Sequence, residues 1–226
     1  MNVTLICDPM MNLEGSIRPA LYLAEELAYK NYNVFMVSPL MSDRVESFLR
    51  ARGITPFNLR TRLFTQTFGS SVSWLEAWVW EAFFKMNSRH FKNNSSIVIN
   101  FSQVVSVPAF AWYLQGPPSL ALKDMEKELL TRFRVLYIFL KTAIKFADER
   151  LIRRLRTIST VVIANSKHCA SMYSKHGVNV DDVIYPPIDC QTFHPSTSSP
   201  SSDYALTYFG KETKFSVIKK VADLGV

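Results

Sequence analysis

Short apolar runs alternate with longer amphipathic stretches along most of this chain, and that alternation limits the fold more than any other feature of the sequence. The apolar runs are rich in β-branched and aromatic side chains, which is typical of strands. One run, residues 54–59, is interrupted by a proline. The predicted strands are residues 3–7, 34–37, 54–59, 97–101, 109–114, 160–164 and 183–185.

The stretches between these runs have the spacing of helices. Ile17, Leu21 and Ala24 are three or four positions apart, so they share one helix face. Ser42 suits the N-cap of the next helix, and Gly53 suits its C-terminal stop. The predicted helices are residues 17–30, 42–52, 74–91, 120–156 (as one helix or two in series) and 166–176.

Strands that alternate with helices predict a parallel sheet covered on both faces, because parallel strands need crossover connections. Right-handed crossovers then wind the chain outward in both directions from the centre of the sheet. We therefore predict an α/β fold with a doubly wound, mainly parallel, Rossmann-like sheet of about seven strands.

A change of composition divides the chain near its C-terminus. Residues 195–203 are rich in serine and proline, which indicates a linker. The strand and helix predicted over residues 204–224 cannot bury a core of their own, so either they dock on the first domain or the natural protein continues past Val226. The predicted parts are a first domain over residues 1–195, a linker over 196–203 and the first β-α unit of a second domain over 204–226.

The charge balance favours an anionic partner. The chain has 26 Lys and Arg against 19 Asp and Glu, for a net charge of +7. Such a field attracts phosphates, acidic lipid surfaces or nucleic acid, although a soluble domain can be basic without any of these partners. No nucleic-acid recognition motif accompanies the charge, so we predict no nucleic-acid partner.

The cysteines and the N-terminus indicate a reducing compartment. Cys7, Cys169 and Cys190 form no C-x-x-C pair, which argues against a zinc site and against a disulfide framework. The N-terminus lacks the pattern of a signal peptide, and no segment approaches the roughly 20 apolar residues of a spanning helix. We therefore predict a cytoplasmic protein, with peripheral association with a membrane as an open alternative.

A basic amphipathic segment supplies the membrane hypothesis. Residues 123–156 contain ten Lys and Arg and five Asp and Glu. Apolar residues recur at helical spacing within the segment, with basic residues between them. One interpretation is contact with an anionic membrane through residues 129–156. The other is a helix packed on the sheet with a solvated basic edge.

Residues 161–195 carry the most specific pattern. A strand ends in Ala164-Asn165-Ser166, a short helix ends at Gly177, and V-I-Y-P-P-I-D follows from residue 183 to 189. Asn165 and Ser166 can cap the next helix, whose N-terminus attracts anions. This ordered set resembles the last β-α-β unit of the N-terminal domain in glycosyltransferase family 4, a large family of retaining enzymes with the GT-B fold.

Two further stretches are similar to the same family. Residues 8–27 resemble its first strand, Gly-rich loop and first helix, although Gly15 is followed by Ser16 where many members have two adjacent glycines. Residues 112–117 resemble a segment that often reads Y-x-H-x-P, with Gln115 at the histidine position. A neutral amide can hydrogen-bond a sugar hydroxyl or a phosphate, but it cannot shuttle a proton.

The resemblance implies a division of labour between two domains. Residues 1–195 would be the acceptor-side domain, and residues 204–226 would begin the donor-binding domain, most of which the chain does not contain. Phe209-Gly210-Lys211 resembles the Gly-Arg start of that domain. The implied acceptor-binding residues are Glu14, Gly15, Ser16, Ser102, Gln115 and Ser166, and the implied donor-phosphate residues are Lys211 and Lys214.

The implied reaction is retaining hexosyl transfer from a nucleotide-sugar to a glycan or lipid-linked acceptor. It needs no metal and no cofactor, because helix N-termini and cationic side chains can neutralise the diphosphate. No catalytic residue is assigned to this chain, and the chain alone is expected to be inactive because donor binding needs the second domain. The alternative is a non-catalytic or partner-dependent half-glycosyltransferase that acts as a binding module.

Overall fold

The computed structural model describes residues 1–13, 15–64, 70–91, 96–126, 131–190 and 215–223. The chain divides into two compact units. The first comprises residues 1–117 and 143–187, and the second comprises residues 118–142 and 188–226. The predicted linker over 196–203 and the predicted strand over 204–209 lie outside the described residues.

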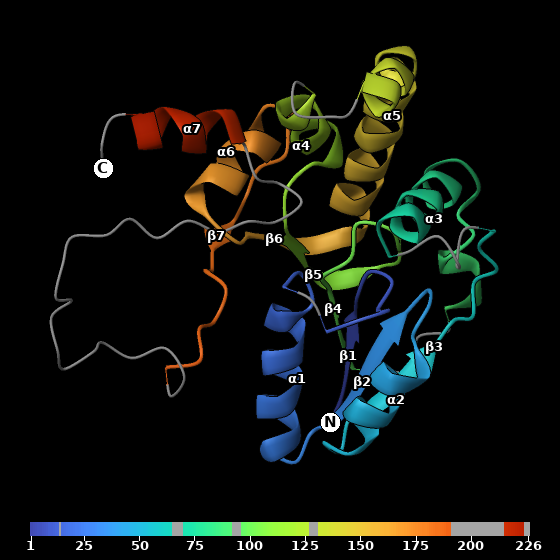
Figure 1. The fold of residues 1–226 in the computed structure, drawn as a ribbon. Coiled ribbons are helices and arrows are strands. Elements are labelled where there is room, and N and C mark those ends of the chain that lie inside the picture. The colour runs from blue at the N-terminus through green and yellow to red at the C-terminus, as the bar shows by residue number, and fades with distance from the viewer. Residues whose placement is uncertain (14, 65–69, 92–95, 127–130, 191–214, 224–226) are drawn as a thin grey trace, which may run out of the picture. The chain divides into compact units, whose positions relative to one another are not determined.

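The first unit is built on a seven-stranded sheet in which every neighbouring pair of strands is parallel (Figure 1). The strand order is β3-β2-β1-β4-β5-β6-β7, so the predicted doubly wound parallel sheet is confirmed. The strands are β1 (Asn2–Ile6), β2 (Asn33–Ser38), β3 (Thr55–Asn58), β4 (Ile97–Asn100), β5 (Ala109–Leu114), β6 (Ser159–Ala164) and β7 (Asp182–Val183).

The helices divide between the two units. The first unit holds α1 (Arg18–Tyr29), α2 (Asp43–Arg50), α3 (Ser70–Phe84), a 3-10 helix (Ser88–His90), α6 (Lys167–Ser174) and the later part of α5 (Thr131–Ile158). The second unit holds α4 (Pro118–Met125), α7 (Phe215–Asp223) and residues 131–142 of α5.

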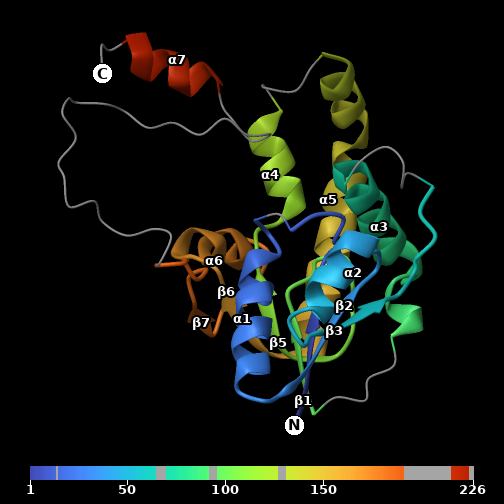
Figure 2. The same ribbon diagram turned by 60° about the horizontal axis from the view of Figure 1, so that its bottom comes forward.

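The core of the first unit lies on both faces of the sheet. Figure 2 shows the helices that flank the strands. Val3 and Leu5 of β1 pack with residues of α1 and α2, whereas Ile6 packs with residues of α3 and α5. Successive side chains of a strand point to opposite faces, so a strand buried on both faces is apolar without interruption. Burying a side chain such as that of Leu5 contributes roughly 1.5–3 kcal/mol.

Three predicted helix boundaries, one start and two ends, are confirmed by the residues at them. The Ser42 hydroxyl accepts a hydrogen bond from the Val45 N–H at 3.3 Å at the start of α2. Gly53 has φ 72° just after α2, and Gly177 has φ 73° after α6. Both values lie in the left-handed region, where glycine is the least strained residue.

The prediction of a helix over residues 74–91 is wrong for the C-terminal part of that range. The helix ends at Phe84, and Lys85 turns the chain with φ 53°. The buried Asn87 then donates its backbone N–H to Glu81 Oε2 and its side-chain amide to Ala77 O. These bonds fold the chain back onto α3, which helical periodicity alone does not reveal.

The long basic stretch forms two helices in series, which was one of the two predicted arrangements. α4 ends at Met125 and α5 begins at Thr131. α5 continues two residues past the predicted end at residue 156, and β6 follows directly. β7 is shorter than predicted and ends at Val183, and the exposed Pro186 and Pro187 lie beyond it.

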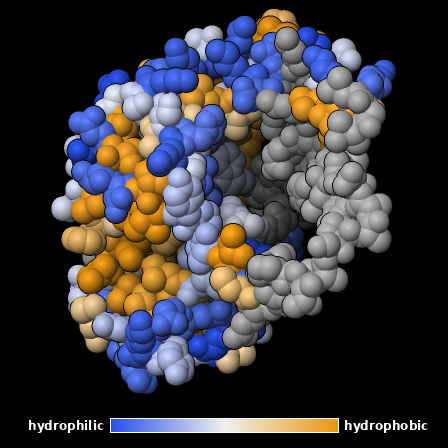
Figure 3. Space-filling model, turned by 90° about the vertical axis from the view of Figure 1, so that its left-hand side faces the viewer, coloured by the Kyte–Doolittle hydropathy of each residue, from blue (hydrophilic) through white to orange (hydrophobic). Residues whose placement is uncertain are grey.

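No helix in the described part of the chain is long and apolar enough to cross a membrane. Large apolar side chains nevertheless reach the surface of the molecule. Figure 3 shows one face on which hydrophobic residues gather over a broad area, with hydrophilic residues above and below them. Among the exposed apolar residues, Phe83, Phe84 and Phe146 belong to helices of the first unit.

Candidate functional site

The candidate site lies where the strand order reverses between β1 and β4. In open parallel sheets, ligands bind outside the carboxyl ends of the strands at such a switch point. β1, β4, β5 and β6 are consecutive neighbours in the sheet, so the loops that follow them lie along one stretch of the carboxyl edge. These are the four loops that the sequence predicted to bind the acceptor.

Asp8 holds the loops after β1 and β4 together. Its Oδ1 accepts a hydrogen bond from the Ser102 hydroxyl at 2.6 Å and one from the Gln103 N–H at 2.9 Å. Its Oδ2 accepts a hydrogen bond from Trp74 Nε1 of α3 at 2.9 Å. We refer to Asp8, Trp74, Ser102 and Gln103 as the Asp8 junction. Both carboxylate oxygens are occupied within the fold, which makes the junction a positioning element.

The Asp8 carboxyl sits in an environment that disfavours its charge. Burial raises the pKa of Asp8 above its ordinary value, and the hydrogen bonds that the carboxylate accepts offset only part of that rise. Burial also raises the pKa of the neighbouring Cys7 thiol, with a further rise from the Asp8 charge. Cys7 is therefore a buried free thiol whose surroundings disfavour the thiolate.

The predicted acceptor residue Ser102 is fully buried. Its hydroxyl donates to Asp8 and accepts from the Val104 N–H at 2.9 Å. The Ser102 N–H in turn donates to Asn100 Oδ1 at 2.7 Å. Ser102 therefore shapes the loop after β4, and its hydroxyl is engaged within the protein.

Gln115 joins two loops of the edge. Its Nε2 donates to Ser16 O at 3.1 Å and to Phe101 O at 3.0 Å. We refer to Gln115, Ser16 and Phe101 as the Gln115 clamp. Both amide hydrogens are engaged, whereas no donor among the described residues reaches Gln115 Oε1. The clamp brings the predicted residues Ser16 and Gln115 together and leaves one acceptor oxygen available.

The loop that leads into α1 is open to solvent. Gly15 and Ser16 are both exposed, and a Cβ placed on Gly15 would meet no atom within 4 Å. Ile17 occupies the N-cap of α1 and makes no side-chain capping bond. The next residue, Arg18, is exposed and forms no ion pair with any described residue. Glu14, the remaining predicted residue of this loop, lies outside the described residues.

Ser166 occupies the N-cap of α6, as the sequence predicted. Its hydroxyl accepts from the Cys169 N–H at 3.1 Å and donates to Asn165 Oδ1 at 3.0 Å. The Asn165 N–H donates to Leu114 O at 3.2 Å, which fixes this turn beside the end of β5. Burial raises the pKa of the Cys169 thiol to about 11, so this free cysteine is not activated.

The predicted donor-phosphate residues, Lys211 and Lys214, lie outside the described residues. The described part of the chain therefore carries only the acceptor-side predictions. Four of these residues, Gly15, Ser16, Gln115 and Ser166, are at least partly exposed along the carboxyl edge.

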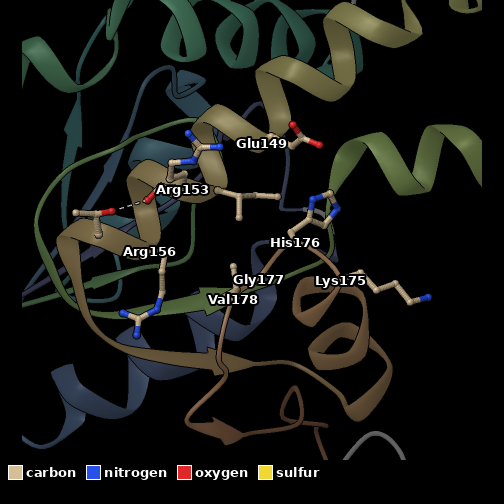
Figure 4. Close-up of a pocket in the computed structure, with 9 residues that line it drawn as sticks. Glu149, Arg153, Arg156, Lys175, His176, Gly177 and Val178 are labelled. Carbon is tan, nitrogen blue, oxygen red and sulfur yellow. Dashed lines mark hydrogen bonds between the residues drawn. The ribbon is translucent and has the colours of Figure 1, made fainter.

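A separate pocket of about 420 Å³ lies at the other end of the strands (Figure 4). The last turns of α5 and the turn after α6 line it, immediately before β6 and β7 begin. Arg153 and Arg156 extend in opposite directions, and Lys175 extends away from both. These cations do not converge on one position, and the pocket contains none of the predicted site residues.

Sequence reasoning missed Asp8 and Gln103 as members of the site. The Gln103 side chain donates to Gly116 O at 2.6 Å and to the Tyr173 hydroxyl at 3.2 Å, so it ties the loops after β4 and β5 to α6. A signal for Asp8 was present, because a carboxylate directly after the first apolar run is placed at the carboxyl edge of a parallel sheet. Gln103 gave no comparable signal.

Comparison with models of known protein families finds none that matches this chain, and comparison with curated proteins finds no match either. The features that bear on function are the residues of the carboxyl edge and the pattern of residues 161–195.

Proposed function

We propose that this chain supplies the acceptor-binding domain of a glycosyltransferase with the GT-B fold, similar to family 4, that transfers a hexosyl group from a nucleotide-sugar with retention. The observation that carries the proposal is the Gln115 clamp. Its fixed amide presents a free carbonyl oxygen at the carboxyl edge, where parallel sheets bind ligands. A fixed acceptor of this kind suits the hydroxyl of a sugar.

The start of α1 supports an anionic group on the acceptor. The N-terminus of a helix favours negative charge. The Arg18 and Leu21 N–H groups donate to backbone carbonyls and Pro19 has no N–H, so the Ala20 N–H is the group of the first turn that is left for an anion. Arg18 adds a full positive charge in the same turn. Gly15 leaves room for a phosphate to approach the backbone. A glycan linked to a lipid phosphate would satisfy both the hydroxyl acceptor and this anion site.

The roles of the chain's own residues follow from these contacts. Gln115 would orient an acceptor hydroxyl, and the start of α1 would hold the acceptor's anionic group. The Asp8 junction would keep the loops after β1 and β4 at a fixed separation. The donor diphosphate would be bound by the second domain, with Lys211 and Lys214 contributing if the resemblance holds. Such positioning supports catalysis by proximity, without a catalytic residue from this chain.

Isothermal titration tests the proposal directly. The chain is titrated with polyprenyl-phosphate-type acceptors in detergent and, separately, with a panel of nucleotide diphosphate sugars. We expect measurable binding of an acceptor and no binding of any donor. Binding of a donor with no acceptor response would contradict the assignment of this chain to the acceptor side.

A pair of amide variants shows where the acceptor binds. Gln115→Ala should reduce acceptor affinity, because it removes the carbonyl oxygen and releases the Ser16 loop. Asn33→Ala is the matched control, since Asn33 is an exposed amide at the start of β2 and bonds only Asn2 among the described side chains. Equal affinity in both variants would move the acceptor away from the Gln115 clamp.

The second candidate function is a binding module that depends on a separate donor-binding chain. The glutamine at position 115 favours it, because an amide cannot shuttle a proton as a histidine can. Adding a separately expressed donor-binding chain distinguishes the two functions. Transfer that appears only in the mixture supports the two-chain enzyme, and acceptor binding without transfer in any mixture supports the non-catalytic module.

A further inference from the structure

α3 differs from an ordinary surface helix because its outward face is apolar. Its inward side buries Ala77, Trp78 and Ala82 against the sheet. Leu75, Val79 and Phe83 recur every four residues on the opposite side and are 40%, 38% and 40% exposed. A helix that covers a sheet normally carries polar residues on that outer face.

α5 extends the apolar surface beyond α3. Phe146, which is 54% exposed, stacks on Phe83 with ring centroids 6.3 Å apart. Phe84 is 51% exposed and contacts Trp80 with ring centroids 5.1 Å apart. We refer to Leu75, Val79, Trp80, Phe83, Phe84 and Phe146 as the aromatic patch. Contiguous exposed apolar residues of this kind mark an interaction surface more often than a free surface.

Positive charges border the aromatic patch. Lys85 directly follows Phe84, and Arg150 and Arg153 lie four and seven positions after Phe146 on the same side of α5. All three side chains are exposed, and none forms an ion pair with a described residue. Glu149, the acidic neighbour on α5, lies 3.7 Å from Lys145. Within the patch, Glu76 accepts a hydrogen bond from Trp80 Nε1 at 2.9 Å. The three exposed cations therefore outnumber the one carboxylate at the patch, and the border of the patch carries a net positive charge.

We infer that the aromatic patch and its cationic rim bind the surface of an anionic membrane. Aromatic and aliphatic side chains enter the headgroup region while lysine and arginine contact acidic lipids. A second copy of the chain fits this surface less well, because a two-fold contact would place one cationic rim against another. The proposal goes beyond glycosyl transfer and does not depend on it.

The structure also changes where the membrane contact is expected. The sequence assigned it to residues 129–156, a segment that is divided between the two units of the chain. The aromatic patch lies within the first unit alone and takes most of its apolar residues from α3. This surface can therefore be tested whatever the arrangement of the second unit.

Vesicle co-sedimentation with the full chain is the first test. The vesicles contain either phosphatidylcholine alone or phosphatidylcholine with a quarter phosphatidylglycerol. We expect binding to the anionic vesicles that falls steeply as salt is raised, and little binding to the neutral ones. Absence of binding to anionic vesicles at low salt overturns the proposal.

Trp80 provides a local spectroscopic signal. Trp78 and Trp112 are fully buried and Trp74 is bonded to Asp8, whereas Trp80 lies at the aromatic patch. Anionic vesicles should shift the tryptophan emission to shorter wavelength, and Trp80→Phe should remove that shift. A shift that persists in Trp80→Phe would place the contact elsewhere on the chain.

Paired variants separate the apolar from the electrostatic contribution. Phe83→Ser with Phe146→Ser should lower vesicle affinity at least about tenfold, because each ring buries a large apolar area. The matched control is Phe57→Ser with Phe110→Ser, which removes two rings of slightly greater exposure from β3 and β5. The control should bind as the unaltered chain does.

The charge pair is Lys85→Glu with Arg150→Glu. Each cation near an anionic surface contributes about fivefold to binding, so this pair should lose at least about twentyfold. Arg44→Glu with Lys175→Glu makes the same change in net charge at exposed positions away from the patch. An equal loss in both pairs would show that net charge, and not this surface, binds the vesicle.

Light scattering distinguishes a membrane from a second copy. The unaltered chain should be monomeric at the concentrations used for sedimentation. A dimer that dissociates in the Phe83→Ser, Phe146→Ser variant, together with unchanged vesicle binding, would assign the patch to self-association and overturn the proposal. Melting temperatures of all variants check folding. They should be nearly unchanged in the paired variants, whose altered side chains are exposed, and slightly lower in Trp80→Phe, because Trp80 is half-buried and donates a hydrogen bond to Glu76.

Discussion

The Asp8 junction and the Gln115 clamp occupy the same edge of the sheet, yet they use their polar atoms differently. Both carboxylate oxygens of Asp8 accept hydrogen bonds from donors of the protein, and its surroundings disfavour its charge. Gln115 donates its two amide hydrogens to backbone carbonyls, and its side-chain oxygen accepts no hydrogen bond from a described residue. One edge can therefore contain a structural element and a binding element side by side. A residue is a candidate to contact a ligand only if it has a donor or an acceptor that is not already bonded within the protein.

Loss of the Asp8 carboxylate should have the largest effect on stability, and it tests whether the Asp8 junction is a structural element. Asp8→Ala would leave donors of Trp74, Ser102 and Gln103 without their acceptor. Unpaired buried donors cost about 1–3 kcal/mol each, so we expect the free energy of unfolding to fall by roughly 3 kcal/mol or more. Urea denaturation measures the change. A loss below about 1 kcal/mol would show that water replaces the carboxylate and that the junction is not a structural element.

Because the pKa of Asp8 is raised in the folded protein, we expect the free energy of unfolding to depend on pH. A carboxyl whose pKa is raised on folding binds its proton more tightly in the folded state than in the unfolded state. Its contribution is therefore fully present below the unfolded pKa and is lost as the pH rises through the folded pKa. The stability of the unaltered chain relative to Asp8→Asn should fall between about pH 4 and the raised pKa, because asparagine does not titrate.

Denaturation of both proteins at several pH values measures this difference. Cys7 and Tyr173 have pKa values that the Asp8 charge raises, but burial makes both titrate at higher pH than this range. Groups that do not interact with Asp8 titrate equally in the two proteins, so the difference in this range isolates Asp8. A difference that grows as the pH rises would mean that the hydrogen bonds outweigh desolvation and that the folded-state pKa is lowered.

A smaller effect on stability is expected at Ser166, which combines a structural role with a side chain that a ligand could reach. Its hydroxyl caps α6, but the side chain is still partly exposed at the edge. Ser166→Ala should cost about 1 kcal/mol through loss of the cap, and Ser166→Asp should keep the cap. If Ser166 also contacts an anionic acceptor, Ser166→Asp would weaken acceptor binding without lowering the melting temperature.

The sheet could be predicted from the sequence because its signals are local and repeated. A strand such as β1 is buried on both faces, and its apolar run is visible without any knowledge of its neighbours. The end of α3 could not be predicted, because it depends on Asn87 and Glu81 meeting after the chain has turned. A hydrogen bond between a side chain and the backbone six positions later leaves no periodic pattern in the sequence.

The candidate site shows the same limit. Gln115 and Ser166 were found because they end strands in a recognisable pattern, and the structure places both at the carboxyl edge. The partnership of Asp8 with Ser102 links residues 94 positions apart, which no motif records. That distant contact decides that Ser102 is engaged inside the protein while Gln115 keeps an oxygen free.

Gly15→Ala should have the smallest effect on folding and therefore separates stability from binding most clearly. Gly15 does not have a left-handed φ, and an added Cβ would meet no atom within 4 Å. The variant should keep its stability or gain up to about 1 kcal/mol, because alanine restricts the unfolded chain. An acceptor phosphate that approaches the backbone at Gly15 would nevertheless meet the new methyl group, so acceptor affinity should fall.

Thermal unfolding and acceptor titration of the same Gly15→Ala preparation measure the two quantities together. Reduced affinity at unchanged stability would locate the acceptor at the loop before α1, because no contact within the protein is altered. Unchanged affinity would remove this loop from the site and leave the Gln115 oxygen as the remaining contact. Reduced stability would show that the added methyl group meets packed atoms at Gly15. The loop before α1 would then be a structural element, as the Asp8 junction is, and not an open binding loop.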